Sequence, residues 1–244
     1  MNAFTMQCKV ELKRTFRNRR FVVMSLLMPI MFYYIFTNAV AGGNAPEGWK
    51  AHYLVSMAAF SVIGTAINTL GLRLVQENTQ GWSRLMRVTP LPNGAYIAAK
   101  MVAQSLINAL CIIVVFVAGF LINHIQLSMW QWISSFFWIL LGSMPFLALG
   151  TLIGTMKRID TASALANILY LSISMLGGLW MPLEIFPKTL QSIGKVLPTY
   201  SFGNGAWNIV DGKAPDLASA ALLAGYLVIF VVLSIYIRKR QEAV

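Results

Sequence analysis

The side chains that most often do chemistry in proteins are scarce in this 244-residue chain, and they lie outside its long apolar stretches. The two histidines, His52 and His124, stand at the ends of such stretches, and no carboxylate lies inside one. Hydrolysis within a membrane would need a pair of aspartates, a serine with a histidine partner, or a zinc site of the H-E-x-x-H type. The sequence therefore predicts no catalytic centre, no metal and no cofactor, and we expect the chain not to be an enzyme.

Nucleotide and proton chemistry also lack their usual residues. No G-x-x-x-x-G-K-[ST] motif is present, so we expect any ATP to be bound by another chain. The one charge within an apolar stretch is Lys100, which lies near its start, so its stem can carry the ammonium group to the lipid head groups. We interpret Lys100 as a boundary marker. Proton coupling would need an ionisable group at greater depth, whereas carbonyls and hydroxyls of broken helices leave sodium coupling open.

The elements that must position these residues are membrane-spanning helices. The chain is 57% hydrophobic and 11% charged, whereas a soluble domain carries about 25% charged residues. A helix needs about 20 apolar residues to cross a bilayer. The stretches that reach this length are 21–41, 53–72, 96–122, 130–156, 161–183 and 217–237. We expect an all-α membrane protein with six transmembrane helices in a single domain, residues 1–244.

Basic residues are distributed unequally between the two sides of these helices. With both termini in the cytoplasm, fifteen of the nineteen Lys and Arg residues fall on the cytoplasmic side. The four on the other side are Lys50, Lys188, Lys195 and Lys213. This asymmetry is the positive-inside rule, and it explains the net charge of +11 without nucleic acid as a partner. We predict a multi-pass protein of a bacterial inner or cell membrane, surrounded by membrane lipids, with both termini cytoplasmic.

Residues 1–20 form a basic cytoplasmic leader. Residues 4–18 are predicted to be helical, with most of the charges, Glu11 among them, away from an apolar arc. That arc carries Phe4, Cys8, Leu12, Thr15 and Phe16. The pattern is typical both of an interfacial helix on anionic head groups and of a solvated leader that only sets orientation. Residues 39–41 resemble a signal-peptide cleavage box, but the apolar run is too long for a signal peptide and we expect an uncut first span.

Two connections are long enough to do more than turn the chain. The cytoplasmic connection, residues 73–95, contains a mixed charged and apolar stretch, 77–88, which predicts a short surface helix that ends before Pro90. The external connection, residues 184–216, is rich in Pro and Gly. Within it, Leu190, Ile193 and Leu197 follow the i, i+3, i+7 spacing of an amphipathic helix.

The fourth apolar stretch carries a helix-packing motif. Gly150 and Gly154 form a GxxxG pair, which allows the backbone of another helix to approach closely. We predict that these two glycines mark a helix contact.

The order of these features resembles the type-2 permease family of ATP-binding cassette (ABC) transporters. In such permeases the loop after the second span carries a Glu, then a Gly, a basic and apolar helix and a Thr-Pro stop. The corresponding residues here are Glu77, Gly81, Arg84, Leu85 and Arg87, followed by Thr89-Pro90. Residues 177–200 are similar to the Gly-rich end of the fifth span and the external helical hairpin of that family. The hairpin residues here are Pro182, Glu184, Pro187, Pro198 and Tyr200.

The resemblance implies a permease subunit that pairs with a cytoplasmic ABC ATPase and with a second permease subunit, as a homodimer or a heterodimer. It implies ATP-driven export of a hydrophobic or amphipathic substrate such as a drug, an antibiotic or a lipid, with residues 77–88 as the ATPase-coupling helix. Two alternatives from other classes remain open. They are a passive channel or secondary transporter that acts without an ATPase, and a membrane anchor or sensor subunit with no role in translocation.

Overall fold

The computed structural model describes residues 3–17, 19–40, 48–82 and 93–242, and within these ranges the chain is helical and contains no strand. The first helices are α1 (Ala3–Arg17), α2 (Arg19–Tyr34) with its π-helical continuation η1 (Ile35–Val40), and α3 (Trp49–Gly64). A second π-helix, η2 (Thr65–Gly71), continues α3 into α4 (Leu72–Thr79). They are followed by α6 (Asn93–Asn123), α7 (Met129–Gly142), α8 (Met144–Ile153) and α9 (Ile159–Leu176). The last elements are η3 (Leu183–Ile185), α10 (Lys188–Val196), α11 (Pro198–Val210) and α12 (Leu217–Glu242).

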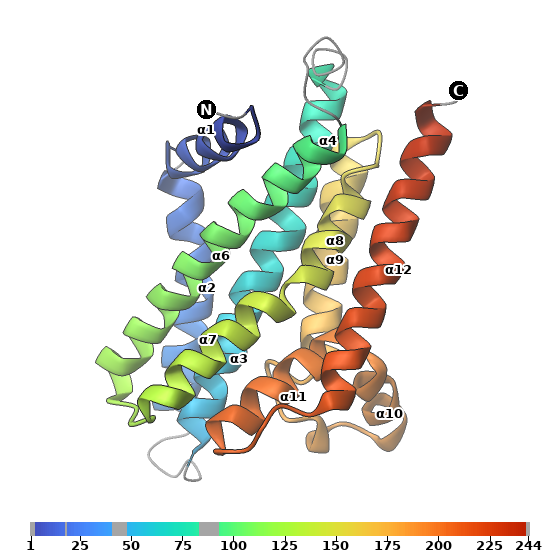
Figure 1. The fold of residues 1–244 in the computed structure, drawn as a ribbon. Coiled ribbons are helices and arrows are strands. Elements are labelled where there is room, and N and C mark those ends of the chain that lie inside the picture. The colour runs from blue at the N-terminus through green and yellow to red at the C-terminus, as the bar shows by residue number, and fades with distance from the viewer. Residues whose placement is uncertain (1–2, 18, 41–47, 83–92, 243–244) are drawn as a thin grey trace.

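The all-α prediction is confirmed. Among the described residues, five helical stretches are long and apolar enough to cross a membrane, and these are Trp49–Thr79, Gly94–Asn123, Met129–Ile153, Ile159–Leu176 and Leu217–Gln241. The apolar stretch Ser25–Ala39, in the first predicted span, is shorter, so the count of six spans stays a prediction. Both ends of the chain lie at the same end of the bundle (Figure 1), which is the arrangement that an even number of crossings produces.

The continuous helix α3–η2–α4 is the centre of the bundle. No proline interrupts it, and nearly all of its side chains are buried, with Met57, Phe60 and Ile63 completely enclosed. Helices α2, α6, α8 and α9 pack around it, whereas α12 packs along α8 and α11 and remains largely exposed. An exposed apolar surface of this kind is what a peripheral membrane helix presents to lipid.

The central helix and α8 approach each other at glycines. A Cβ atom on Gly150 would overlap the carbonyl oxygen of Ala66, and one on Gly154 would lie 2.6 Å from the Cβ atom of Leu74. On the facing helix, a Cβ atom on Gly71 would lie 3.1 Å from the carbonyl oxygen of Gly150. The two backbones therefore lie directly against each other, as small residues permit.

The predicted fourth span is broken at Ser143. Helix α7 begins with a capping box, in which Ser128 and Gln131 each accept a hydrogen bond from the backbone N–H of the other. It ends at Gly142, and Pro145, which has no N–H to donate, lies in the first turn of α8. The helices on the two sides of the break have different partners. Before it, α7 packs on α6 and α11, and after it, α8 packs along α12. Figure 1 shows α7 leaning away from α12 as a result.

The helix of the predicted fifth span ends earlier than expected, at Leu176 and not at residue 183. Gly177 and Gly178 form a turn there, and Gly178 has a φ angle of +80°, which favours glycine. The chain then folds back as η3, α10 and α11 (Figure 1). Helix α10 includes Leu190 and Ile193 of the predicted amphipathic helix. Helix α11 is part of the core, since Phe202 is completely buried and the helix packs on α3 and α7.

Candidate functional site

Five charged side chains meet where α1, α4 and α6 converge, at the end of the bundle that carries both chain termini (Figure 1). They are Glu11 and Arg14 of α1, Arg73 and Glu77 of α4, and Lys100 of α6. We call this group the ionic cluster. Its members come from three regions of the sequence, so only the folded chain brings them together.

Lys100 is at the centre of the ionic cluster. Its Nζ atom lies 2.6 Å from Glu11 Oε1 and 2.9 Å from the Glu77 carboxylate, and its side chain is only 1% exposed. The interpretation of Lys100 as a boundary marker that reaches the head groups was therefore wrong. The physical reason is that α1 and α4 each place a carboxylate beside the ammonium group of Lys100. Its charge is therefore compensated inside the protein and does not need the lipid head groups.

The two arginines occupy the remaining sides of the carboxylates. Arg14 Nη1 lies 2.6 Å from Glu77 Oε1, and Arg73 Nη1 lies 3.4 Å from Glu11 Oε2. Both carboxylates are almost completely buried, and each has two cationic partners. If Lys100 were removed, each carboxylate would keep one arginine, but the two buried negative charges would lose the cation that both contact. Breaking buried ion pairs by removing one partner typically costs about 3–5 kcal/mol.

Neutral groups complete the hydrogen bonding of the ionic cluster. The hydroxyl of Tyr96 donates to Glu77 Oε2, and Gln7 Nε2 donates to Glu11 Oε1 at 3.1 Å. The Tyr96 ring centroid lies 5.0 Å from Lys100 Nζ, within the range of a cation–π contact. The adjoining cavity has a volume of only about 10 Å³, at or below what one water molecule needs. The ionic cluster is therefore a closed joint between helices, with no room for a substrate.

The spacing of residues along α4 and α6 explains why each helix contributes two side chains to the ionic cluster or to its hydrogen bonds. Arg73 and Glu77 are four residues apart on α4, and Tyr96 and Lys100 are four residues apart on α6, so each pair shares one helix face. Arg73, Tyr96 and Lys100 were not predicted to have this role. The signal that was available is the i, i+4 spacing of these polar residues at the ends of apolar helices.

Helix α1 contributes a face that the sequence did not predict completely. Cys8 and Thr15 of the predicted arc do face the bundle, and the Cys8 thiol lies 3.6 Å from the carbonyl oxygen of Ala99. Glu11, which was placed away from the arc, is buried with them, while Lys9 is exposed. The missed signal is that Glu11 is the single acidic residue among the first 46 residues of the sequence, in an otherwise basic leader.

The predicted coupling residues are only partly within the described chain. Glu77 lies in α4, and Gly81, with a φ angle of +79°, follows the end of that helix. The predicted surface helix 77–88 therefore does not begin at Glu77, because the spanning helix extends to Thr79 and carries the Glu77 side chain into the ionic cluster. Arg84, Leu85 and Arg87 lie outside the described residues, and their role in coupling stays a prediction.

The predicted hairpin residues lie at the opposite end of the bundle. Pro187 directly precedes α10, and Pro198 is the first residue of α11. Pro182, Glu184 and Tyr200 line a cleft of about 270 Å³ between α3, α11 and the turn that follows α9. Burial, and then the nearby negative charge of Glu184, raise the pKa of Tyr200. We call this space the α3–α11 cleft.

Polar contacts hold α11 to α3 along this cleft. His52 Nε2 lies 2.6 Å from Asp211 Oδ1 at its rim, and both side chains are about one-third exposed. The indole N–H of Trp207 donates to Ser56 Oγ at 2.8 Å. In the part of the chain that the structure describes, no three His, Cys, Asp or Glu side chains are grouped so that they could hold a metal ion.

A bundle of apolar helices with its buried charges collected at one end and clefts at the other is typical of a multi-pass helical membrane protein. Residues 34–236 match the family described as "ABC-2 family transporter protein", and the chain belongs to this family. The predicted resemblance to the type-2 permeases of ABC transporters is thereby confirmed, and the chain is a membrane permease.

Two proteins of Bacillus subtilis (strain 168) are similar to this chain. "Putative transport permease YvfS" is 50% identical over 246 residues, which cover 100% of both chains. "Uncharacterized transmembrane protein YxlG" is 29% identical over 110 residues, which cover 41% of each chain. The first similarity extends over the ionic cluster and both ends of the bundle, because it spans the full chain.

Proposed function

We propose that this permease is the membrane subunit of an ATP-driven exporter, which works with a separate cytoplasmic ABC ATPase and with a second permease subunit. Membership of the ABC-2 family and the lack of a nucleotide-binding motif in the sequence support this dependence on partner chains. The observation that carries the proposal is that two paired members of the ionic cluster, Glu77 and Lys100, come before and after residues 80–92 in the sequence. These residues contain the predicted coupling positions Arg84, Leu85 and Arg87, and we call them the coupling segment.

The ionic cluster flanks the coupling segment on both sides. Glu77 precedes the segment, Lys100 follows it, and the two side chains are paired at 2.9 Å. Glu11 joins α1 to the same pair. A force applied by an ATPase to residues 84–87 would therefore move α1, α4 and α6 together. Since α4 continues the central helix, the movement would reach the α3–α11 cleft at the other end.

The α3–α11 cleft supports a hydrophobic or amphipathic substrate. Aromatic side chains form much of its wall, among them Trp49, Tyr53, Trp180 and Trp207. An aromatic wall with charged groups at Glu184 and at the His52–Asp211 pair favours compounds that have an apolar body and a small polar part. The cleft lies at the end of the bundle opposite to the ionic cluster, so release there would move the substrate away from an ATPase that acts at the cluster end.

The test is reconstitution of the permease with its ATPase in liposomes that contain a fluorescent amphipathic dye. ATP added outside reaches only the transporters whose ATPase faces outwards, and an exporter would then accumulate dye in the lumen. Dye flux at the same rate without ATPase would contradict the proposal and favour a passive channel or secondary transporter.

The coupling role is tested by reversing charges. Arg84→Glu with Arg87→Glu should abolish substrate-stimulated ATPase activity and leave membrane insertion intact. The matched control is Lys157→Glu with Arg158→Glu, which reverses two exposed charges in the short connection between α8 and α9. Full stimulation in the Arg84 and Arg87 double variant would overturn the coupling assignment.

A further inference from the structure

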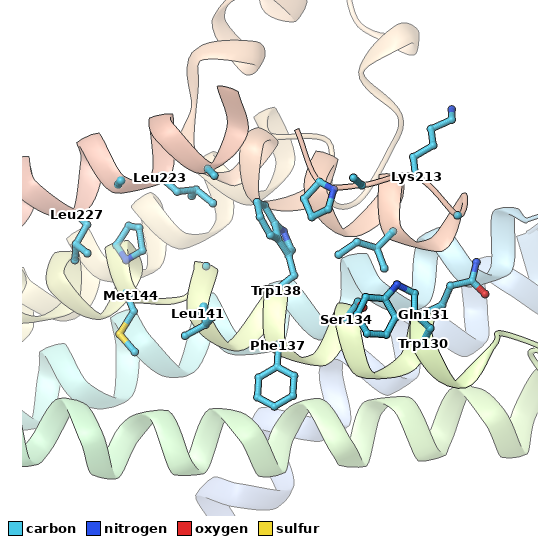
Figure 2. Close-up of a pocket in the computed structure, with 18 residues that line it drawn as sticks. Trp130, Gln131, Ser134, Phe137, Trp138, Leu141, Met144, Lys213, Leu223 and Leu227 are labelled. Carbon is cyan, nitrogen blue, oxygen red and sulfur yellow. The ribbon is translucent and has the colours of Figure 1, made fainter. Parts of the chain in front are cut away.

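A second and larger cleft, of about 640 Å³, opens between α7 and α12. We call it the α7–α12 cleft. It exists because the break at Ser143 lets α7 diverge while α8 stays against α12. Figure 2 shows Trp130, Gln131 and Lys213 at one end of this cleft and Met144 and Leu227 at the other. None of the predicted hairpin residues lines it, and neither Glu77 nor Gly81 does.

The walls of this cleft are mostly apolar. Leu141 of α7 and Leu223 and Leu227 of α12 face each other across it. Trp138 lies between α7 and α11, where its indole N–H donates to the backbone oxygen of Phe202 at 2.9 Å. Because the hydrogen-bonding group of Trp138 is already satisfied, the ring offers the cleft an apolar surface.

The length of the cleft corresponds to one leaflet of a bilayer. From Trp130 to Leu141, α7 rises about 16 Å at about 1.5 Å per residue. Half of a hydrocarbon core about 30 Å thick is about 15 Å. Trp130 is 75% exposed at the mouth, and tryptophan is enriched at the level of the lipid head groups. The part of α7 that borders the cleft is therefore about as long as one leaflet is thick, with Trp130 at its outer end.

A cation stands at the head-group end of the cleft. Lys213 follows Gly212, whose φ angle of +76° ends α11. Its side chain is 71% exposed, and Asp211 Oδ2 lies 3.9 Å from its Nζ atom, at the limit of an ion pair. The other oxygen of Asp211 lies 2.6 Å from His52 Nε2. Lys213 is thus only weakly paired and is free to contact a phosphate.

We propose that the α7–α12 cleft binds a phospholipid, with one acyl chain along its apolar walls and the phosphate beside Lys213. The lipid would fill the space that the break in the fourth span creates and would support α7 against α12. Such a lipid binds whether or not the chain exports its substrate, so the site can be tested without ATP or ATPase.

The experiment uses the full chain in liposomes that contain a trace of phosphatidylglycerol with a photoactivatable group in its acyl chain. After irradiation, labelled peptides are mapped by mass spectrometry. Labelling of α7 and α12 should exceed labelling of the exposed outer face of α6, which includes Leu110, Val114 and Val117. Equal labelling of the two surfaces would mean ordinary contact with bulk lipid and would overturn the proposal.

Two pairs of variants test the two halves of the site. Ala224→Phe fills the cleft and should reduce its labelling to the level of the α6 face, whereas Ala221→Phe on the same helix, outside the cleft, should not. Lys213→Gln should reduce the preference for phosphatidylglycerol over diacylglycerol with the same chain by about fivefold, the effect of one lysine at an anionic lipid surface. Lys195→Gln removes an exposed charge elsewhere and should leave that preference unchanged.

Two other results of the labelling experiment would also decide whether a lipid occupies the α7–α12 cleft. Labelling that survives Ala224→Phe would place the lipid outside the cleft. Loss of labelling when two copies of the chain are cross-linked would show that a second subunit covers the cleft. Either result would overturn the proposal. Failure of ATP-driven export alone would leave it intact.

Discussion

The two ends of the bundle differ in how closely their helices are packed and in where their charges lie. At the end that carries the termini, the ionic cluster fills the space between α1, α4 and α6, and the cavity beside it holds about 10 Å³. At the other end, the same bundle leaves clefts of about 270 and 640 Å³, bordered by aromatic and aliphatic side chains. Buried charges therefore occur where the helices are joined, and open volume occurs where charges are few and exposed.

This difference shows which part of the molecule can move at low cost. Pulling the α1–α4–α6 joint apart would expose or isolate buried charges, so the joint behaves as one body. At the opposite end α11 packs on α3 through apolar side chains, and the polar links between them are a hydrogen bond and a partly exposed His–Asp pair, each worth about 1 kcal/mol or less. We expect conformational change to be concentrated at the end that carries the clefts.

The largest expected effect is at Lys100. Lys100→Met should lower the free energy of unfolding by about 3–5 kcal/mol, because Glu11 and Glu77 would be left buried beside each other without their shared cation. Denaturant titration in detergent micelles measures the change. Lys188→Met, at an exposed lysine, is the control and should stay within about 0.5 kcal/mol. If Lys100→Met lowered the free energy of unfolding no more than Lys188→Met, the ionic cluster would not be the more firmly joined end of the bundle.

A second, smaller loss is expected at the contact between α8 and the central helix. Gly150→Ala places a methyl group on the carbonyl oxygen of Ala66, and overpacking of this kind should lower the free energy of unfolding by about 1–3 kcal/mol. Gly225→Ala in α12 is the matched control, because its methyl group would have no heavy atom within 4 Å. If the two variants are equally stable, Gly150 does not mark an essential contact.

Next in order is the hydrogen bond between α3 and α11. Ser56→Ala removes the acceptor of the Trp207 indole N–H and should lower the free energy of unfolding by about 1 kcal/mol. The comparison is Ser192→Ala, which removes an exposed hydroxyl that donates to the Lys188 carbonyl on α10. Dye transport is measured in parallel, since looser packing of α11 should change transport more than stability if this end is the one that moves.

The smallest effect is expected for the exposed pair at the rim of the α3–α11 cleft. Asp211→Asn should lower the free energy of unfolding by less than about 1 kcal/mol, because solvent screens the contact with His52. Raising the salt concentration to about 0.5 M should remove most of that difference and leave the effect of Lys100→Met largely unchanged. Equal salt sensitivity at the two sites would mean that the ionic cluster is not shielded from solvent.

Much of the architecture was predictable because the bilayer imposes simple rules. Apolar stretches of spanning length predicted the helices, and the order of motifs led to the family that the comparison supports. Boundaries were less accurate. The fifth helix ends at Leu176 because of the turn at Gly177 and Gly178, and the fourth is broken at Ser143 before Pro145. Glycine and proline signal such breaks in the sequence, but their exact position depends on the neighbouring helices.

The sequence by itself determined that this chain is a helical membrane protein, because composition and the lengths of apolar runs decide whether a segment can leave water. It also selected Glu77 as a residue of interest, although for another role. Only the tertiary structure decided that Glu11, Glu77 and Lys100 form one joint, since a charge is compensated by what lies beside it in space. The clefts were likewise invisible in the sequence, because empty space depends on the angles between helices.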